Sequence, residues 1–381
     1  MSELSYLEKL LDGVKVEWLP LASLCALITT GKLNANAMDD KGKYPFFTCN
    51  EQPYKINTYA FDLEAIIISG NGSQVGHLNY YKGKFNAYQR TYIVGDFNSN
   101  VNIMYLYYYL IHTLKPYIHK NSRKGSVPYI TMPMLENFIF PIPCPDNPEK
   151  SLAIQSEIVR ILDTFTALTA ELTAVLSMRK NQYNYYRDQL LSFEEDEVEW
   201  KNLGAVVEIN TGQKPSEILD NPTTFDYINA GTTRSGYTTV SNCDGDTVTT
   251  PSRGQGGIGF VGYQQGPFWL GPLCYKMRAI DKRILINKFL FYFLQSRSEL
   301  LLNLKKEGGV PAVNKSDLAT LAIPLPPLDE QNRIVAILDK FYILTNSITE
   351  GLPREIELRQ KQYEYYRDML FSFPKPEVAE A

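Results

Sequence analysis

Two stretches of the chain carry the spacing of helices that pair along a single apolar seam, with intervals that alternate between three and four residues. The first seam consists of Ile158, Ile161, Phe165, Leu168, Leu172 and Val175. The second consists of Ile334, Ile337, Phe341, Leu344 and Ile348. Such a seam favours a partner helix along its whole length, so we expect the two helices to pack against each other. The alternative is that each lies on the surface of its own domain.

The segments between these helices, residues 16–147 and 198–326, follow strand patterns broken by Gly, Asn and Pro. The expected strands are Ala65–Ser69, Gln89–Val94, Asp226–Ala230 and a glycine-rich turn with strand at Ser252–Gly262. The expected helices are Ile103–Leu114 and Lys288–Leu302. Each segment ends in a proline-rich exit, Pro141-Ile142-Pro143 and Pro324-Leu325-Pro326. The pattern therefore predicts two similar α+β domains.

A repeated segment supports this duplication. RKNQYNYYRDQLLSF at Arg179–Phe193 returns as RQKQYEYYRDMLFSF at Arg359–Phe373, with ten of fifteen positions identical. Residues 1–15 have leucines at helical spacing and lead into Val16-Glu17-Trp18, as a similar stretch leads into Val198-Glu199-Trp200. The chain thus starts part-way through a repeat unit, and we expect its termini to come together in a cyclic arrangement.

The two helices differ in length by one short unit. The offset between the two copies is 176 residues at Phe165 and Phe341 but 180 residues in the Tyr-rich ends. The second half therefore carries four extra residues between its apolar seam and its Tyr-rich end. The stretch from Leu168 to Leu176, LTAELTAVL, has leucines at a period of four, and Gly351-Leu352-Pro353 should interrupt the second helix. Four residues correspond to about 6 Å of helix.

Charge follows the same division. The whole chain has a net charge of −4, but residues 16–147 carry 11 basic against 9 acidic residues and residues 198–326 carry 13 against 11. Residues 148–197 and 327–381 are acidic, with nets of −4 and −3. A weakly basic character of the globular parts is compatible with nucleic-acid binding, which the whole-chain charge would hide.

Several kinds of chemistry find no support. The five cysteines are scattered and the histidines are only three, so neither disulfides nor a metal site are predicted. Gly257–Gly262 fits G-x-G-x-x-G, but the pattern after it is a strand and not the helix that a dinucleotide site needs. Methyltransferase, P-loop and nuclease motifs are missing. No run of about 20 apolar residues and no signal peptide are evident, so we expect a cytoplasmic, non-catalytic protein.

Polar and basic residues occupy matching loops in both halves. Arg and Lys can contact guanine edges or phosphates, and Asn and Gln can pair with adenine. As a set, these residues favour DNA as the partner, although each alone could be a solvated loop side chain. The candidate DNA-binding residues are Lys32, Asn71, Ser73, Gln74, Arg90, Arg123, Lys124, Ser126, Gln213, Lys214, Arg234, Arg253, Gln255, Lys305 and Lys306.

The helical segments also resemble a known family. Residues 326–339, PPLDEQNRIVAILD, resemble the PP-L-x-E-Q signature of the specificity subunits of Type I restriction–modification systems. Residues 154–163, IQSEIVRILD, are a looser copy, with PDNPEK in place of a clean Pro-Pro-Leu before it. The Thr-Ala-Glu-Leu stretch before the first Tyr-rich segment resembles the IC subgroup of that family.

This resemblance implies two target-recognition domains held apart by two long antiparallel helices, with an internal pseudo-twofold repeat and with the termini close together. Each domain would read one half of a bipartite, asymmetric site on double-stranded DNA. Two methyltransferase subunits would dock on the helices and restriction subunits would join them, with S-adenosylmethionine, ATP and Mg²⁺ on those partners and none in this chain. The predicted boundaries are 1–15, 16–147, 148–197, 198–326 and 327–381.

The helices would thus both set the spacer and present the docking surface. The residues expected to carry these roles are Ile158, Phe165, Leu172, Tyr183, Tyr186, Arg187, Ile334, Phe341, Ile348, Tyr363, Tyr366 and Arg367. Exposed tyrosine clusters are typical of protein interfaces. Three alternatives remain: a duplicated coiled-coil scaffold, a stand-alone DNA-binding protein, and a self-contained methyltransferase or nuclease.

Overall fold

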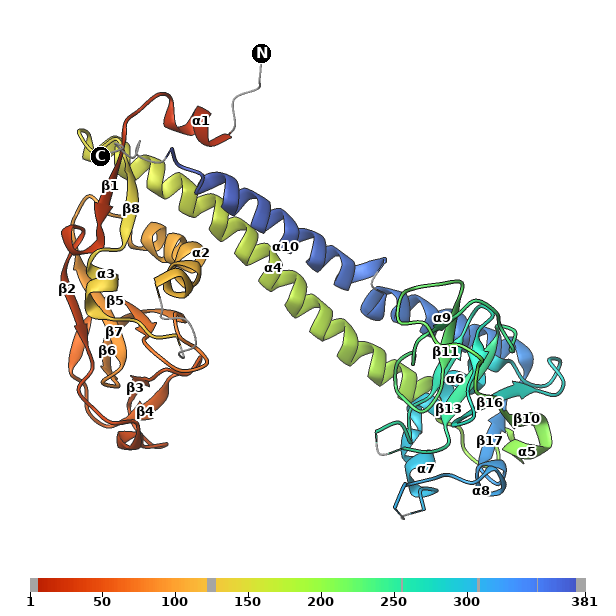
Figure 1. Ribbon diagram of the computed structural model, residues 1–381. Helices are drawn as coiled ribbons and strands as arrows, with labels where there is room; N and C mark the ends of the chain where they lie inside the picture. The colour runs from red at the N-terminus through yellow and green to blue at the C-terminus, as the bar shows by residue number, and fades with distance from the viewer. Residues whose placement is uncertain (1–5, 122–127, 255, 307–308, 348, 375–381) are drawn as a thin grey trace. The chain divides into compact units, whose positions relative to one another are not determined.

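A computed structural model describes residues 6–121, 128–254, 256–306, 309–347 and 349–374. The chain divides into two units (Figure 1). Unit 1 comprises residues 1–171 and 356–381, and unit 2 comprises residues 172–355. Both boundaries fall inside helices. This division therefore differs from the predicted boundaries, which set residues 148–197 and 327–381 apart as helical segments of their own. The mixture of helices and sheets confirms the predicted α+β class.

Unit 1 is built on a six-stranded sheet in the order β2-β7-β5-β6-β3-β4. Its strands are β2 (Cys25–Thr30), β3 (Tyr44–Phe47), β4 (Tyr54–Ile56), β5 (Phe61–Ser69), β6 (Leu78–Ala87) and β7 (Thr91–Phe97). A separate antiparallel pair joins β1 (Val16–Pro20) to β8 (Ile139–Pro143). The helices are α1 (Tyr6–Leu11), α2 (Ile103–Asn121) and α3 (Met132–Glu136), together with the first part of α4 (Pro148–Leu190) and the last part of α10 (Gly351–Leu370).

Unit 2 repeats this plan. The four-stranded sheet β10-β16-β13-β14 corresponds to β2-β7-β5-β6, and β17 pairs with β9 as β8 pairs with β1. The strands of these sheets are β9 (Glu199–Asn202), β10 (Val207–Thr211), β13 (Thr247–Pro251), β14 (Gly262–Gln264), β16 (Cys274–Ala279) and β17 (Ala322–Leu325). A further sheet consists of β11 (Phe225–Ile228), β12 (Tyr237–Thr238) and β15 (Trp269–Leu270). The helices are α5 (Leu203–Val206), α6 (Asn287–Ser296), α7 (Ser298–Asn303), α8 (Lys315–Ala319) and α9 (Leu328–Asn346), together with the last part of α4 and the beginning of α10.

Each unit has a core that joins its sheet to one long helix. In unit 1 the buried face of α2, including Tyr105 and Leu110, packs with Ile66 and Ile68 of β5 and with Ile158 of α4. In unit 2 the corresponding core contains α6, β13 and Ile334 of α9. The sheet-containing domain and its part of the long helices therefore share a continuous core in each unit.

The first and last segments of the described chain both belong to unit 1. Leu7 and Leu11 of α1 share a core with Phe371 and Phe373, and the indole Nε1 of Trp18 donates a hydrogen bond of 2.9 Å to the carbonyl oxygen of Pro374. The segments near the two termini thus come together, as the repeat predicted.

Several predicted elements have different bounds in the structure. The helix expected at Ile103–Leu114 runs on through Pro116 to Asn121, because its apolar face continues with Leu114 and Ile118. The helix expected at Lys288–Leu302 is broken at Arg297, which leaves helical geometry (φ −117°, ψ 36°) and separates α6 from α7.

The expected strand content of Ser252–Gly262 was also wrong. In its described part, residues 252–254 and 256–261, this stretch is turn and loop between β13 and β14, and strand geometry resumes only at Gly262. The strand β13 was overlooked because its sequence, TVTTP, looks polar, yet all five of its residues are buried. Elsewhere the second helix is interrupted in the expected region, but the break lies between Asn346 and Gly351, and Gly351-Leu352-Pro353 begin α10.

Candidate DNA-binding loops and spacer helices

In unit 1, loops gather at the end of the sheet where β2 and β5 finish and β7 begins. We call residues 31–33, 70–74, 88–90 and 128–130 loop end 1. Backbone hydrogen bonds join them: Gly31 N to Thr91 O (3.1 Å), Gly70 N to Arg90 O (2.9 Å) and Ile130 N to Gly70 O (2.9 Å). These bonds hold four stretches of the chain, far apart in sequence, side by side.

Most of the candidate side chains of unit 1 lie on loop end 1. Lys32, Ser73 and Arg90 are exposed, and Gln74 is partly exposed. Asn71 is half-buried, and its side-chain oxygen accepts a hydrogen bond of 3.1 Å from the thiol of Cys49. The structure thus brings together two exposed basic groups with amide and hydroxyl groups, which is the chemistry that contacts phosphates and base edges.

Loop end 2 is the corresponding set in unit 2, comprising residues 212–214, 252–254, 270–273, 306 and 309–313. The amide of Ser252 donates to Leu273 O and the amide of Val313 donates to Ser252 O, each at 2.9 Å. This second bond is the counterpart of the bond from Ile130 to Gly70. The two units therefore assemble their loops by the same backbone connections although the loop sequences differ.

The basic candidates of unit 2 flank a single residue of loop end 2. The backbones of Arg253 and Lys306 each pair with the backbone of Ala312 in an isolated antiparallel β-bridge. Both side chains are exposed, as are Gln213 and Lys214, whereas Lys305 is partly buried. The ammonium of Lys306 lies 2.7 Å from a carboxylate oxygen of Asp317, and this contact holds the pKa of Asp317 below its ordinary value.

Two glycines at equivalent positions make this close packing feasible. A Cβ on Gly31 would lie 2.0 Å from Ala87 O, and one on Gly212 would lie 1.9 Å from Leu270 O. No side chain can be accommodated at such distances. Gly31 and Gly212, which directly follow β2 and β10, are therefore sites where a loop lies directly on the end of a strand, β6 or β15.

Arg234 is the described candidate that lies elsewhere. It belongs to the loop between β11 and β12, where its guanidinium pairs with Asp226 at 3.2 Å and lies 5.0 Å from the ring centroid of Tyr237. Its charge is thus partly neutralised within the domain. The candidates Arg123, Lys124, Ser126, Gln255 and Ile348 lie outside the described residues.

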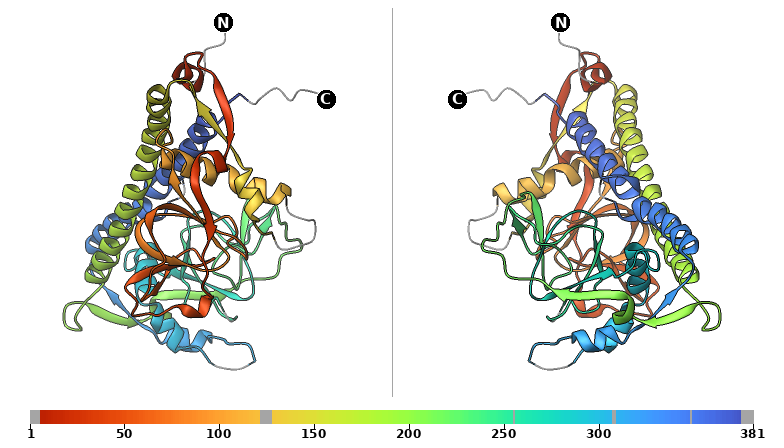
Figure 2. Two further views of the ribbon diagram at one scale, coloured as in Figure 1. Left: turned by 90° about the vertical axis from the view of Figure 1, so that its left-hand side faces the viewer. Right: turned by 90° about the vertical axis from the view of Figure 1, so that its right-hand side faces the viewer.

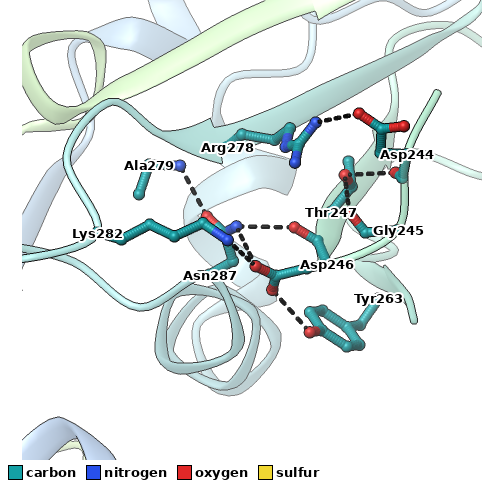
Figure 3. Close-up of polar contacts among 9 residues, drawn as sticks. All are labelled: Asp244, Gly245, Asp246, Thr247, Tyr263, Arg278, Ala279, Lys282 and Asn287. Atoms are coloured by element: carbon teal, nitrogen blue, oxygen red, sulfur yellow. Dashed lines mark hydrogen bonds and ion pairs between the residues drawn. The ribbon is translucent and has the colours of Figure 1, made fainter. Parts of the chain in front are cut away.

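A polar network that the sequence did not suggest fixes the start of β13 (Figure 3). Asp246, which has a positive φ of 51°, accepts hydrogen bonds from Tyr263 (2.8 Å), Lys282 (2.8 Å) and Asn287 (3.1 Å). Burial alone would raise the pKa of Asp246, but these three donors hold it below its ordinary value. Because they come from β14, from the loop after β16 and from α6, the carboxylate ties the start of β13, whose far end leads into loop end 2, to three neighbouring parts of the domain.

The seam residues pack as helix-pair contacts within each unit. In unit 1 the rings of Phe165 in α4 and Tyr366 in α10 stack with centroids 5.2 Å apart, and these parts of the two helices lie side by side in both views (Figures 1 and 2). In unit 2 Phe341 in α9 stacks on Tyr186 in α4 at 5.8 Å. Ile158 and Ile334 are fully buried, and Leu172 is half-buried.

The structure separates the tyrosines of each repeat by their role. Tyr183 is buried, Tyr363 is partly buried, and the guanidinium groups of Arg187 and Arg367 lie 5.7 and 5.8 Å from the centroids of these rings. These four residues, like Tyr186 and Tyr366, contribute to packing within the chain.

The middle tyrosine of each repeat points outward. Tyr185 and Tyr365 are 61% and 65% exposed, so these members of the Tyr-rich segments are the ones that a partner subunit can reach. Their position could have been found from the sequence, because seam positions recur every three or four residues and Tyr183 and Tyr186 already fill them.

The surface of α4 carries further exposed apolar side chains. This is the one helix of the described chain that is long and apolar enough, by length and composition, to cross a membrane, and only 6% of that apolar stretch is buried. The sequence expectation that no stretch suits a membrane span therefore does not hold by this measure. An exposed apolar helix of this kind is typical of a surface that another subunit covers.

Comparison with known proteins identifies the family. Residues 14–177 and 195–358 each match the family described as Type I restriction modification DNA specificity domain. The chain is 41% identical over 415 residues to the Type I restriction enzyme EcoR124I/EcoR124II specificity subunit of Escherichia coli, covering 99% of both. It is 36% identical over 393 residues to the EcoprrI specificity subunit of the same species, covering 92% of this chain and 93% of the relative.

Solved structures share the fold. The S subunit of a Type I restriction–modification system from M. genitalium aligns with a TM-score of 0.65 at 16% identity, over 96% of this chain and 98% of that one. A chain from a study of complex assembly of the Type I system aligns with a TM-score of 0.60 at 15% identity, over 93% of this chain and 97% of that one. The chain belongs to the family of DNA specificity subunits of Type I restriction–modification systems.

Proposed function

We propose that this chain selects the DNA sequence on which a Type I restriction–modification complex acts, with loop end 1 and loop end 2 each reading one half of a bipartite, asymmetric site. The observation that carries this proposal is the pair of loop ends, built by equivalent backbone bonds and lined with exposed basic and amide groups. Their differing side chains, Lys32 and Arg90 against Lys214 and Arg253, suit two different half-sites.

The helices supply the second part of the function. Paired helices are stiff, so they would keep the two readers at one separation and allow only one length of unread spacer. The exposed Tyr185 and Tyr365, at equivalent positions of the repeat, offer two equivalent docking points, and this supports two methyltransferase subunits per chain. Restriction subunits would join that assembly in the cytoplasm.

The chemistry would then reside on the partners. S-adenosylmethionine would bind to the methyltransferase subunits, and ATP and Mg²⁺ to the restriction subunits. This chain would direct them and would not itself catalyse a reaction. Within the part of the chain that the structure describes, His, Cys, Asp and Glu side chains form no group of three that could hold a metal ion.

Methylome sequencing of cells that express this chain with its methyltransferase partner tests the proposal. We expect methylated adenines within a single bipartite motif that has two fixed halves and a fixed gap. Expression of the partner alone is the control and should give no such motif. Full sequence specificity of the purified chain without its partner, or methylation with a single continuous motif, would contradict the proposal.

A further inference from the structure

A buried glutamine on each spacer helix holds the beginning of the long helix of its recognition domain. Gln155 in α4 accepts a hydrogen bond of 2.8 Å from the amide of Asn102, directly before α2, and donates to Asn100 O at 3.2 Å. Its amide nitrogen also donates to Ser151 Oγ at 3.0 Å, within α4. The side chain has no exposed surface, so it belongs to the junction and not to a site that solvent or DNA can reach.

Gln331 in α9 makes the equivalent contacts in unit 2. It accepts from the amide of Ile286, directly before α6, at 2.9 Å, and it donates to Ile284 O and Pro326 O at 2.8 Å each. It is likewise fully buried. Amides at the beginning of a helix have no partner within the helix, so each glutamine completes a helix terminus from a different element.

A tyrosine–aspartate hydrogen bond forms a second link between the same two helices. Tyr108 of α2 donates to Asp163 of α4, and Tyr292 of α6 donates to Asp339 of α9 at 2.6 Å. In unit 2 the ammonium of Lys288 adds a contact of 2.8 Å to the same carboxylate. Burial, reinforced by the aspartate, raises the pKa of both tyrosines, so each remains a donor throughout the physiological range.

The spacing of the two links is the same in both units. The aspartate follows the glutamine by eight residues in α4 and in α9, which places the links about 12 Å apart along the spacer helix. The tyrosine follows the bonded amide by six residues in α2 and in α6. Together with the shared core, two separated points of attachment fix the axial position and the rotation of one helix against the other more firmly than a single point would.

We propose that these links, Gln155 with Tyr108–Asp163 and Gln331 with Tyr292–Asp339, are positioning residues that set the spacing and phase of the two DNA half-sites. The inference rests on the proposed function. One base pair of spacer changes the separation of the half-sites by about 3.4 Å and their rotation by about 35°. A reader that could rotate on its spacer helix would accept neighbouring spacings, and the links prevent that rotation.

The test uses the full chain assembled with its methyltransferase partner. The substrate is a DNA library with both native half-sites and with spacers from two base pairs shorter to two base pairs longer. The variant Tyr108→Phe/Tyr292→Phe removes one oxygen atom from each link and retains both rings. The matched control is Tyr105→Phe/Tyr117→Phe, since those hydroxyls donate at 2.6 Å to Pro141 O and at 3.1 Å to Met134 O, within the recognition domain of unit 1 and outside loop end 1.

In the link variant, we expect the ratio of methylation at spacers one base pair from the native length to methylation at the native spacer to rise about tenfold. This is the factor that corresponds to the free energy lost with a hydrogen bond to a charged acceptor. The bases required in each half-site should stay the same, and the control should keep the native spacer profile. A spacer profile of the link variant that coincides with that of the control would overturn the inference, as would equal loss of methylation at all spacers.

Two further variants guard against a simple folding defect. Asp163→Asn keeps an oxygen acceptor for Tyr108 and should retain the native spacing, whereas Asp163→Leu should broaden it. Equal behaviour of these two variants would also count against the inference. Absence of bipartite methylation in the unaltered complex would overturn the proposed function itself, and this failure is distinguishable because it appears before any substitution is made.

Discussion

The exposed tyrosines of the two repeats give the sharpest test of how this chain assembles with its partners. Tyr185 and Tyr365 are 61% and 65% exposed. An aromatic side chain buries about 150–250 Å² when fully covered, so each tyrosine offers roughly 120 Å² to a partner. At about 25 cal/mol per Å², covering this area contributes about 3 kcal/mol per site. Substitution of either tyrosine by alanine should therefore weaken binding of one methyltransferase subunit about 100-fold.

Isothermal titration of the partner subunit into the purified chain measures this effect. Tyr185→Ala should leave one tight and one weak site, and Tyr185→Ala/Tyr365→Ala should leave two weak sites. The matched control is Lys180→Ala, an exposed residue of the same repeat. Melting temperatures should remain unchanged, because neither tyrosine is part of a core. A dissociation constant of the double variant within about twofold of the unaltered chain would refute the assignment of this surface.

The remaining predictions concern DNA and stability. Insertion of one Thr-Ala-Glu-Leu unit after Leu172 adds about 6 Å of helix, so methylome sequencing should show a longer spacer with unchanged half-sites; altered half-sites would contradict it. Exchange of residues 16–147 for those of a relative should change one half-site only. Arg253→Ala should cost about 1–3 kcal/mol in binding at the half-site read by unit 2, measured by fluorescence anisotropy on DNA with either half-site altered; equal loss at both halves would argue against it.

Asp246→Asn should lower the free energy of unfolding at neutral pH by about 1–2 kcal/mol, because the side chains of Tyr263, Lys282 and Asn287 then lose their charged acceptor. The folded-state pKa of Asp246 is depressed, so its contribution is present above the unfolded pKa and disappears as the pH falls through the folded value. Urea unfolding at several pH values should therefore show that the difference in free energy of unfolding between the variant and the unaltered chain becomes smaller at acidic pH. A difference that is the same at neutral and acidic pH would contradict this account.

Local periodicity predicted the helices well and the strands less well. The seam from Ile158 to Leu172 is visible in the sequence because packing requires an apolar residue every three or four positions. The strand β13 was hidden, since a run of threonines can be buried when their hydroxyls bond within the domain, as Thr250 Oγ1 does to Phe260 O at 2.8 Å. The break at Arg297 also has no local signal.

For the candidate site, the sequence likewise predicted which residues to select but not the contacts that they make. Residue types and symmetric positions were enough to select Lys32, Arg90 and Arg253, but the contact between their loops depends on tertiary hydrogen bonds that no local pattern encodes. Gln155 and Gln331 illustrate the limit: the sequence showed them as parts of a signature, and only the structure shows what their amides bind. Arg234 was selected for its charge, although its guanidinium forms an ion pair with Asp226 and lies over the ring of Tyr237.

The contact between Trp18 and Pro374 has a consequence for the order in which the protein is completed during synthesis. Unit 2 is one continuous stretch, residues 172–355, so the ribosome delivers all of it before the end of translation. Unit 1 comes first and is finished last, because Leu370, Phe371 and Phe373 belong to its core. A nascent chain therefore keeps an apolar surface of unit 1 uncovered while unit 2 folds. Premature termination near the end of the message should harm the domain that was made first.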